Sequence, residues 1–125
     1  MTHFPQTNSQ HRAPRVQLGE SVLALVKSDD GQRAKARLQT VSMTGGLLHL
    51  ARALEEGDFV EVAFQTQNGP VHGMAEMLHP RQVSAQSIVQ AFRFIALDDD
   101  DHKNLSFAVS TTTERNLLLG SNQYS

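Results

Sequence analysis

Two arginines near the start of the chain, Arg12 and Arg15, have side chains suited to binding an anion or a nucleobase. Arginine presents a planar fork of N–H donors, which matches two phosphate oxygens or the O6 and N7 atoms of guanine. His11 directly precedes them and, in its neutral form, can add one further donor. Segment 11–15 therefore predicts a local anion- or base-binding site, although the arginines could also be solvated residues that flank a strand.

A second segment, residues 40–47, combines Ser42 with two adjacent glycines, Gly45 and Gly46. A serine hydroxyl can donate a hydrogen bond to a phosphate or a base, and glycine permits close backbone approach and a positive φ where a side chain would collide. An anion or base could lie against such a segment. Serine, threonine and glycine are also the usual residues of tight turns, so a strand-to-strand turn without a ligand is the alternative.

The remaining reactive residues form no catalytic or metal-binding pattern. The six histidines lack the H-x-H and H-E-x-x-H spacings of metal sites, and the aspartates at 98–101 lack the glycine and distal glutamate of a calcium loop. Neither Ser42 nor Ser84 lies in a G-x-S-x-G elbow, and no carboxylate pair has a recognisable catalytic context. We therefore expect neither an enzyme nor a bound metal or other cofactor.

Length and charge limit the class of protein further. The 125 residues predict one domain with a single core, and the formal net charge of −2 gives no general attraction to nucleic acid or an acidic membrane. The absence of cysteine excludes disulfides, thiolate catalysis and cysteine-ligated zinc. Residues 1–10 contain no signal-peptide core, and no apolar run reaches the ~20 residues that a membrane helix needs. We expect a cytoplasmic protein without membrane insertion.

The elements that would position these residues are short strands. Alternating apolar and polar residues, as in segment 33–41, predict strands with one wet face. The sequences Asp-Asp-Gly at 29–31 and Gln-Asn-Gly at 67–69 predict hairpin turns in which glycine supplies a positive φ. Close antiparallel pairing of this kind favours a barrel or a sandwich. Six segments have strand character: residues 18–27, 33–41, 46–51, 59–66, 70–78 and 84–97.

The end of the chain predicts a helix. The aspartates at 98–101 suit a helix N-terminus, and Leu105, Ala108 and Val109 form an apolar stripe that would cover one end or face of the barrel. Residues 1–10 are expected to be flexible. Residues 110–125 are expected to form a flexible or partly helical tail, in which the leucines at 117–119 could dock on a surface.

Taken together, the two motifs resemble those of the PilZ domain, a bacterial receptor domain for cyclic di-GMP. An RxxxR segment leads into the family's barrel, and a D/N-x-S-x-x-G segment lies on it. Arg15 matches the second arginine and His11 stands in place of the first, while Ser42 and Gly45 match and Thr40 replaces the acidic or amide residue. The resemblance spans roughly residues 11–109, in the family's order, and implies a mainly β fold: a six-stranded antiparallel PilZ-like β-barrel with a C-terminal α-helix.

The resemblance implies a signalling receptor that binds cyclic di-GMP, changes its N-terminal segment and regulates a protein partner controlling motility, pili, polysaccharide or biofilm. Met77 lies near the place where many members carry an aromatic residue for base stacking.

The alternative is a PilZ adaptor that binds no nucleotide and acts through exposed strand edges or the leucine-containing tail. A third possibility, a barrel binding single-stranded nucleic acid, would need aromatic platforms and a basic groove. One Tyr, no Trp and a net negative charge argue against it, so no nucleic acid partner is expected. The implied ligand-binding residues are His11, Arg12, Arg15, Thr40, Ser42, Gly45, Gly46 and Met77.

Overall fold

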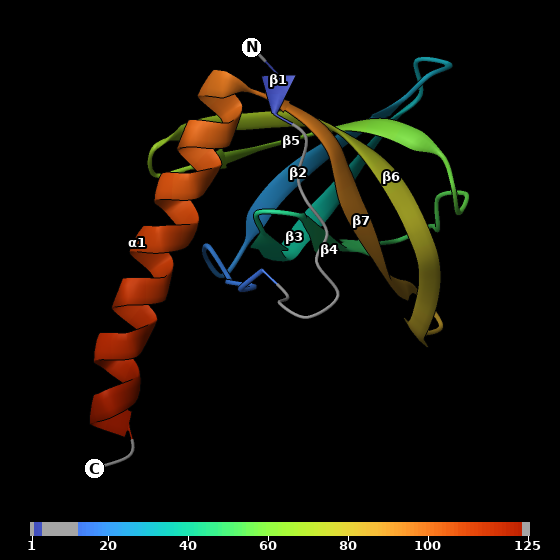
Figure 1. Ribbon diagram of the computed structural model, residues 1–125. Helices are drawn as coiled ribbons and strands as arrows, with labels where there is room; N and C mark the ends of the chain where they lie inside the picture. Colours follow the sequence, from blue (N-terminus) through green and yellow to red (C-terminus); the bar gives the residue numbers. More distant parts are fainter. Residues whose placement is uncertain (1, 4–12, 124–125) are drawn as a thin grey trace.

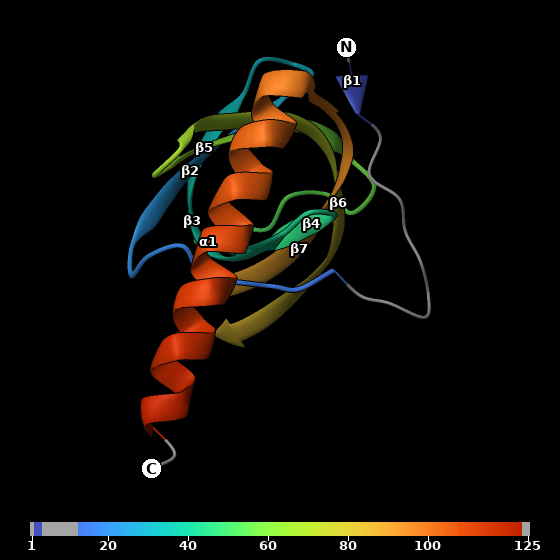
Figure 2. The ribbon, with the colours of Figure 1, turned by 60° about the vertical axis from the view of Figure 1, so that its left-hand side comes forward.

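Six antiparallel strands close into a barrel, and one long helix lies against it (Figure 1). The structure, a computed structural model, describes residues 2–3 and 13–123. Figure 2 shows the helix in front of the ring of strands, with its C-terminal part extending beyond the barrel. The elements are β1 (Thr2–His3), β2 (Val22–Ser28), β3 (Arg33–Ser42), β4 (Gly45–Leu50), β5 (Phe59–Thr66), β6 (Gly69–Ser84), β7 (Ser87–Asp98) and α1 (Asp99–Gln123).

The barrel closes through the pairing of its two longest strands, β6 and β7. The strand order is β1-β7-β4-β3-β2-β5-β6, and the further β6–β7 pairing joins the ends of this sheet. Every strand from β2 to β5 is therefore hydrogen-bonded on both sides. The expectation of a six-stranded antiparallel barrel with a C-terminal helix is confirmed, with two-residue β1 added beside β7.

Strict alternation along the strands produces the core. On β2, Ala24 and Val26 are buried while Leu23 and Leu25 face outward. Leu105 and Val109 of α1 join the same core, so the predicted apolar stripe is the face that packs on the barrel. Two side chains near the start of the helix attach it to β6. Asp101 accepts a hydrogen bond from the His72 amide at 2.9 Å, and Asn104 donates one to the Pro70 carbonyl at 2.8 Å.

Most expected bounds lie close to the observed ones, with differences at β2, at β6 and β7, and in the helix. β2 begins at Val22 rather than residue 18, because the chain bends at Glu20 and Ser21 before it enters the barrel. β6 continues to Ser84 rather than ending at residue 78, because its second half pairs with β7. β7 accordingly begins at Ser87 rather than at residue 84, after a two-residue turn. The helix continues through most of the segment expected to be flexible or partly helical.

The two predicted hairpin turns are present with the expected backbone. Gly31 and Gly69 have φ values of 86° and 124°, the left-handed region that glycine adopts without steric cost. Within the described part of the chain, no helix has the length and apolar character needed to span a membrane.

Candidate functional site

The turn between β3 and β4 carries the serine-glycine motif, and the Ser42 hydroxyl organises it. Ser42 is only 3% exposed. Its Oγ accepts from the Thr44 amide at 3.2 Å and donates to the Gly45 carbonyl at 3.3 Å. The hydroxyl therefore has a structural role in closing the turn before any ligand is considered.

The two glycines of this motif allow β4 to approach β7 closely. A Cβ on Gly45 would lie 2.1 Å from the backbone oxygen of Phe92, and one on Gly46 would lie 2.8 Å from the Phe92 ring. Neither glycine has a positive φ, so the turn does not use the left-handed conformation that glycine permits. The close backbone approach that glycine permits is the feature that the structure uses, with Phe92 as the neighbour.

The N-terminal segment meets the serine-glycine motif through an isolated β-bridge. Val16 and Val41 exchange two backbone hydrogen bonds, of 2.8 Å and 2.9 Å, in antiparallel register. In that register the residue before Val16, Arg15, stands opposite the residue after Val41, Ser42. Arg15 is exposed, so its guanidinium is available to solvent beside the motif. The structure thus brings together two segments that lie about 25 residues apart in the sequence.

Thr40 lies one residue before Val41 on the same strand and therefore on the opposite face of the sheet, outward from the barrel. Its Oγ1 is covered from solvent and has no hydrogen-bond partner in the part of the chain that the structure describes. A covered, unpaired hydroxyl is costly, and native structures usually satisfy it with a side chain, a water or a ligand. Thr40 is the position at which the motif departs from the family pattern.

The other expected ligand residues are placed differently. His11 and Arg12 lie outside the described residues. Met77 is 0% exposed, and its backbone pairs with Gly57 and Asp58 on the neighbouring loop. Its side chain belongs to the barrel interior and, in this arrangement, offers no surface on which a base could stack.

Register places one cation beside the motif that sequence reasoning missed. Arg93 on β7 stands directly opposite Gly45 on β4 and also opposite Glu76 on β6, with which it forms an ion pair. The Phe94 amide donates to the Thr44 carbonyl at 2.9 Å and so fixes the turn against β7. Only the pairing of β4 with β7 reveals this neighbourhood, because nothing in the spacing of residues 42–45 points to residue 93.

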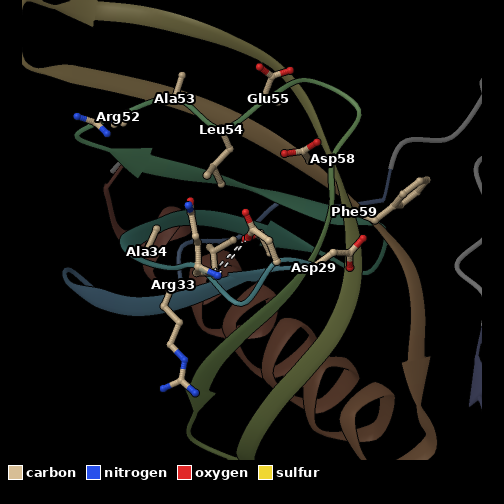
Figure 3. Close-up of a pocket in the computed structure, with 13 residues that line it drawn as sticks. Asp29, Arg33, Ala34, Arg52, Ala53, Leu54, Glu55, Asp58 and Phe59 are labelled. Carbon is tan, nitrogen blue, oxygen red and sulfur yellow. Dashed lines mark hydrogen bonds between the residues drawn. The ribbon is translucent and has the colours of Figure 1, made fainter.

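A separate hollow of about 610 Å³ lies at the other end of β3, between the β2–β3 hairpin and the loop before β5 (Figure 3). Figure 3 shows Leu54 directed into it, while the Arg33 side chain points away. Arg33 and Ser42 are the two ends of β3, nine residues or ~30 Å apart along an extended strand. The hollow mixes acidic and basic side chains and is distinct from the site around Ser42.

Among the side chains that the structure describes, no group of three or more histidines, aspartates or glutamates is arranged to hold a metal ion. The polar groups around the motif are the guanidiniums of Arg15 and Arg93, the hydroxyls of Ser42 and Thr40, and turn backbone, which suit an anionic or hydrogen-bonding ligand.

Several solved structures resemble this fold. The PilZ domain of YcgR from Escherichia coli, solved with c-di-GMP, is 18% identical with a TM-score of 0.70, over 91% of this chain and 98% of that one. The c-di-GMP complex of MrkH from K. pneumonia is 13% identical, with a TM-score of 0.67, over 94% of this chain and 57% of that chain. The Bacillus subtilis inhibitor of motility MotI is 9% identical, with a TM-score of 0.65, over 83% of this chain and 53% of that one.

At these identities the likeness shows the fold alone, and this chain spans little more than half of the MrkH and MotI chains. The comparison with curated protein sequences gave no significant match. The family of PilZ domains, however, matches residues 9–109, most of the chain. PilZ domains are ligand-binding receptor or adaptor domains and are not known as enzymes. The chain belongs to the PilZ domain family.

Proposed function

We propose that this chain is a cyclic di-GMP receptor that works in the bacterial cytoplasm and uses the junction between residues 11–16 and the β3–β4 turn as its ligand site. The observation that carries the proposal is the Val16–Val41 bridge, which places Arg15 beside Ser42. Two structural neighbours, the YcgR domain and MrkH, were solved with c-di-GMP, and this supports the choice of ligand.

The chemistry of the site fits such a ligand. Its phosphodiesters are anionic and its guanines present O6 and N7, and both features match the donor fork of Arg15. Thr40 Oγ1 has unsatisfied hydrogen-bonding capacity within the described structure, and it would become a further point of attachment on a rearrangement that uncovers it. His11, Arg12, Ser42 and the two glycines complete the proposed contact set; Met77 would join it only through a rearrangement of β6.

Binding would fix the N-terminal segment over the barrel. Residues 11–15 precede the bridge at Val16 directly, so a ligand held by Arg15 restrains the chain on the side that leads to residues 1–10. The changed surface would then be recognised by a protein partner that controls motility, pili, polysaccharide or biofilm. The resemblance to MotI, an inhibitor of motility, supports this class of output.

Calorimetric titration of the purified chain with cyclic di-GMP, with GTP and cyclic AMP as controls, tests the ligand. Arg15→Ala should weaken binding by tenfold or more, since a charge-assisted hydrogen bond contributes ~1.5–3 kcal/mol. The matched control is Arg81→Ala, which removes another exposed arginine, on β6. Equal affinities of wild type and Arg15→Ala would contradict the site assignment.

A repair experiment tests the two departures from the family pattern. His11→Arg combined with Thr40→Asp should tighten binding roughly tenfold or more, because a good bidentate contact contributes ~1–3 kcal/mol. If the double variant folds and still gives no heat of binding, the ligand function has been lost.

The second candidate function is a PilZ adaptor that binds no nucleotide. Three observations favour it: the altered residues at positions 11 and 40, the Ser42 hydroxyl already engaged in its turn, and the complete burial of Met77. The closed barrel leaves no free edge on β2 to β5, so the expected interaction through strand edges has no support on these strands. A wild-type chain that binds none of the three nucleotides would support this function.

A further inference from the structure

The outer face of β2 exposes two large apolar side chains in one row. Leu23 is 58% exposed and Leu25 is 48% exposed, and both point away from the core. Ala63 on β5 stands opposite Leu25 and continues the row. These residues, with Pro70 and His72 of β6, line a groove of about 490 Å³. Two adjacent exposed leucines over a groove leave more apolar surface in water than isolated surface residues do.

A row of cations borders this groove on the β3 side. Arg37 stands opposite Leu23 and Lys35 opposite Leu25, and Lys27 and Arg33 stand opposite each other at the next paired position. All four side chains are exposed, and none takes part in an ion pair in the described part of the chain. They are four of the eleven lysines and arginines in a chain whose net charge is −2.

This charge distribution is unfavourable for the isolated domain. Like charges directly opposite each other on paired strands destabilise a sheet, and Lys27 and Arg33 have that relation. Lys35 lies between Arg33 and Arg37 on the same face of β3. β2 and β3 contain no acidic residue. The one acid of β5, Glu61, stands opposite Lys27 and approaches His72 on β6 at 3.6 Å, so no acidic residue stands opposite the three cations of β3. An acidic partner would relieve the repulsion.

The shape and chemistry of the groove select among anionic partners. The large hydrophobic side chains exposed in its lining are the two leucines, and its one Phe, Phe64, is buried, so no Phe, Tyr or Trp ring is open for stacking a nucleobase. The formal net charge of −2 gives no general attraction to an anionic bilayer. Since β2, β3 and β5 are paired on both sides, an added β-strand cannot bind there through its backbone.

We propose that the groove lined by Leu23, Leu25 and Ala63, with its border of Lys27, Arg33, Lys35 and Arg37, is a docking surface for an acidic amphipathic helix of a partner protein. The apolar ridge of that helix would lie over the leucines, and its acidic residues would face the β3 cations. The surface is separate from the residues of the proposed nucleotide site, and it does not depend on that function.

The test uses a phage-displayed pool of random 16-residue peptides, selected on the full chain in low salt and without nucleotide. Enriched peptides should be acidic, with apolar residues at helical i, i+3/i+4 spacing. Fluorescence anisotropy with synthetic copies should then show that the variants Leu23→Ser/Leu25→Ser and Lys35→Glu/Arg37→Glu bind these peptides at least about tenfold more weakly than wild type. The control pair Arg81→Glu/Lys103→Glu, with the same change in net charge, should bind within about twofold of wild type.

Circular dichroism of each variant verifies that the barrel is folded, as expected for substitutions of exposed side chains. The proposal is overturned if no acidic peptides are enriched, or if the enriched peptides bind the folded groove variants as well as wild type. It is also overturned if phosphatidylglycerol vesicles sediment the wild type but not Lys35→Glu/Arg37→Glu, because the surface then binds lipid. Since no nucleotide is present, failure here leaves the receptor proposal standing, and failure of the calorimetric titration leaves this one standing.

Discussion

Gly45 offers a direct measure of how much of the serine-glycine motif serves the fold. Replacing it with alanine adds one Cβ, which would lie 2.1 Å from the Phe92 backbone oxygen and 3.1 Å from the Arg93 Cα. Both contacts are with the backbone of β7, which is paired with β4 on one side and β6 on the other. No side-chain rotation can relieve them, so β4 and β7 have to separate locally.

The expected cost follows from this geometry. Overpacking by one methyl group costs ~1–3 kcal/mol, and contact with a fixed carbonyl places Gly45→Ala at the upper end. Loss of glycine flexibility in the unfolded chain returns only ~0.4–1 kcal/mol. We therefore expect a decrease of ~2 kcal/mol or more in the free energy of unfolding, and a melting temperature lower by ~8 °C or more.

Urea unfolding followed by far-ultraviolet circular dichroism measures this change, since the chain has no tryptophan to report by fluorescence. The matched control is Gly19→Ala, whose Cβ would meet only Val22 Cγ2 at an ordinary 3.4 Å. It should change stability by less than ~0.5 kcal/mol. Equal unfolding midpoints for the two variants would refute the argument that Gly45 is required by the β4–β7 contact.

Three further predictions concern polar groups. Thr40→Val should be neutral or stabilising by up to ~1 kcal/mol, because Thr40 Oγ1 has no hydrogen-bond partner among the described residues. Ser42→Ala should destabilise by ~0.5–1.5 kcal/mol, because it removes the two hydrogen bonds that the hydroxyl makes within the turn. A lower urea midpoint for Thr40→Val than for Ser42→Ala would contradict this. Gln90→Met should lower the free energy of unfolding by ~2–4 kcal/mol, because the buried Gln90 amide hydrogen-bonds three backbone groups of Leu54 and Leu78 at 2.8–2.9 Å. A melting temperature within a degree of wild type would exclude that role. Hydrogen bonds from the Ser28 hydroxyl and, next, the Gln32 amide lower the pKa of Asp30. The Asp30 carboxylate therefore stabilises the hairpin at pH above its unfolded-state pKa, and it loses that effect as pH falls through its folded-state pKa. A carbon-detected NMR titration should show a higher pKa for Asp30 in Ser28→Ala, and an unchanged pKa would disprove the cause.

Much of the barrel was predictable because its signals are local. The strand over 33–41 was predicted from alternation, and the turns at Gly31 and Gly69 from short turn sequences, so each prediction needed only neighbouring residues. The structure confirms the strand and the positive φ of both glycines. Met77 was predictable in the same way: Val71, Ala75 and Met77 share one face of β6, and all are fully buried. The alternation along β6 was therefore the correct signal for Met77, and its nearness to the family's stacking position was misleading.

The contacts between distant segments could not be predicted from the sequence. The pairing of Gly45 with Arg93 depends on register across β4 and β7, and the register of β6 with β7 shifts at three places. The position of Arg15 opposite Ser42 depends on one bridge outside the regular strands. Local patterns contain no information on such offsets, because a one-residue slip changes which side chains share a face.

The residues that match the family motifs differ in whether the fold itself needs them. Ser42, Gly45 and Gly46 are each required by the turn and by the approach of β4 to β7, whatever ligand is present. Their presence therefore indicates the barrel and does not distinguish a receptor from an adaptor. Arg15 and Thr40 have no comparable structural duty: the first is exposed and the second has an unpaired hydroxyl in the described structure. Whether the chain binds a nucleotide thus depends on these two residues and on residues 11–12, and substitutions there discriminate between the two functions where substitutions at the glycines cannot.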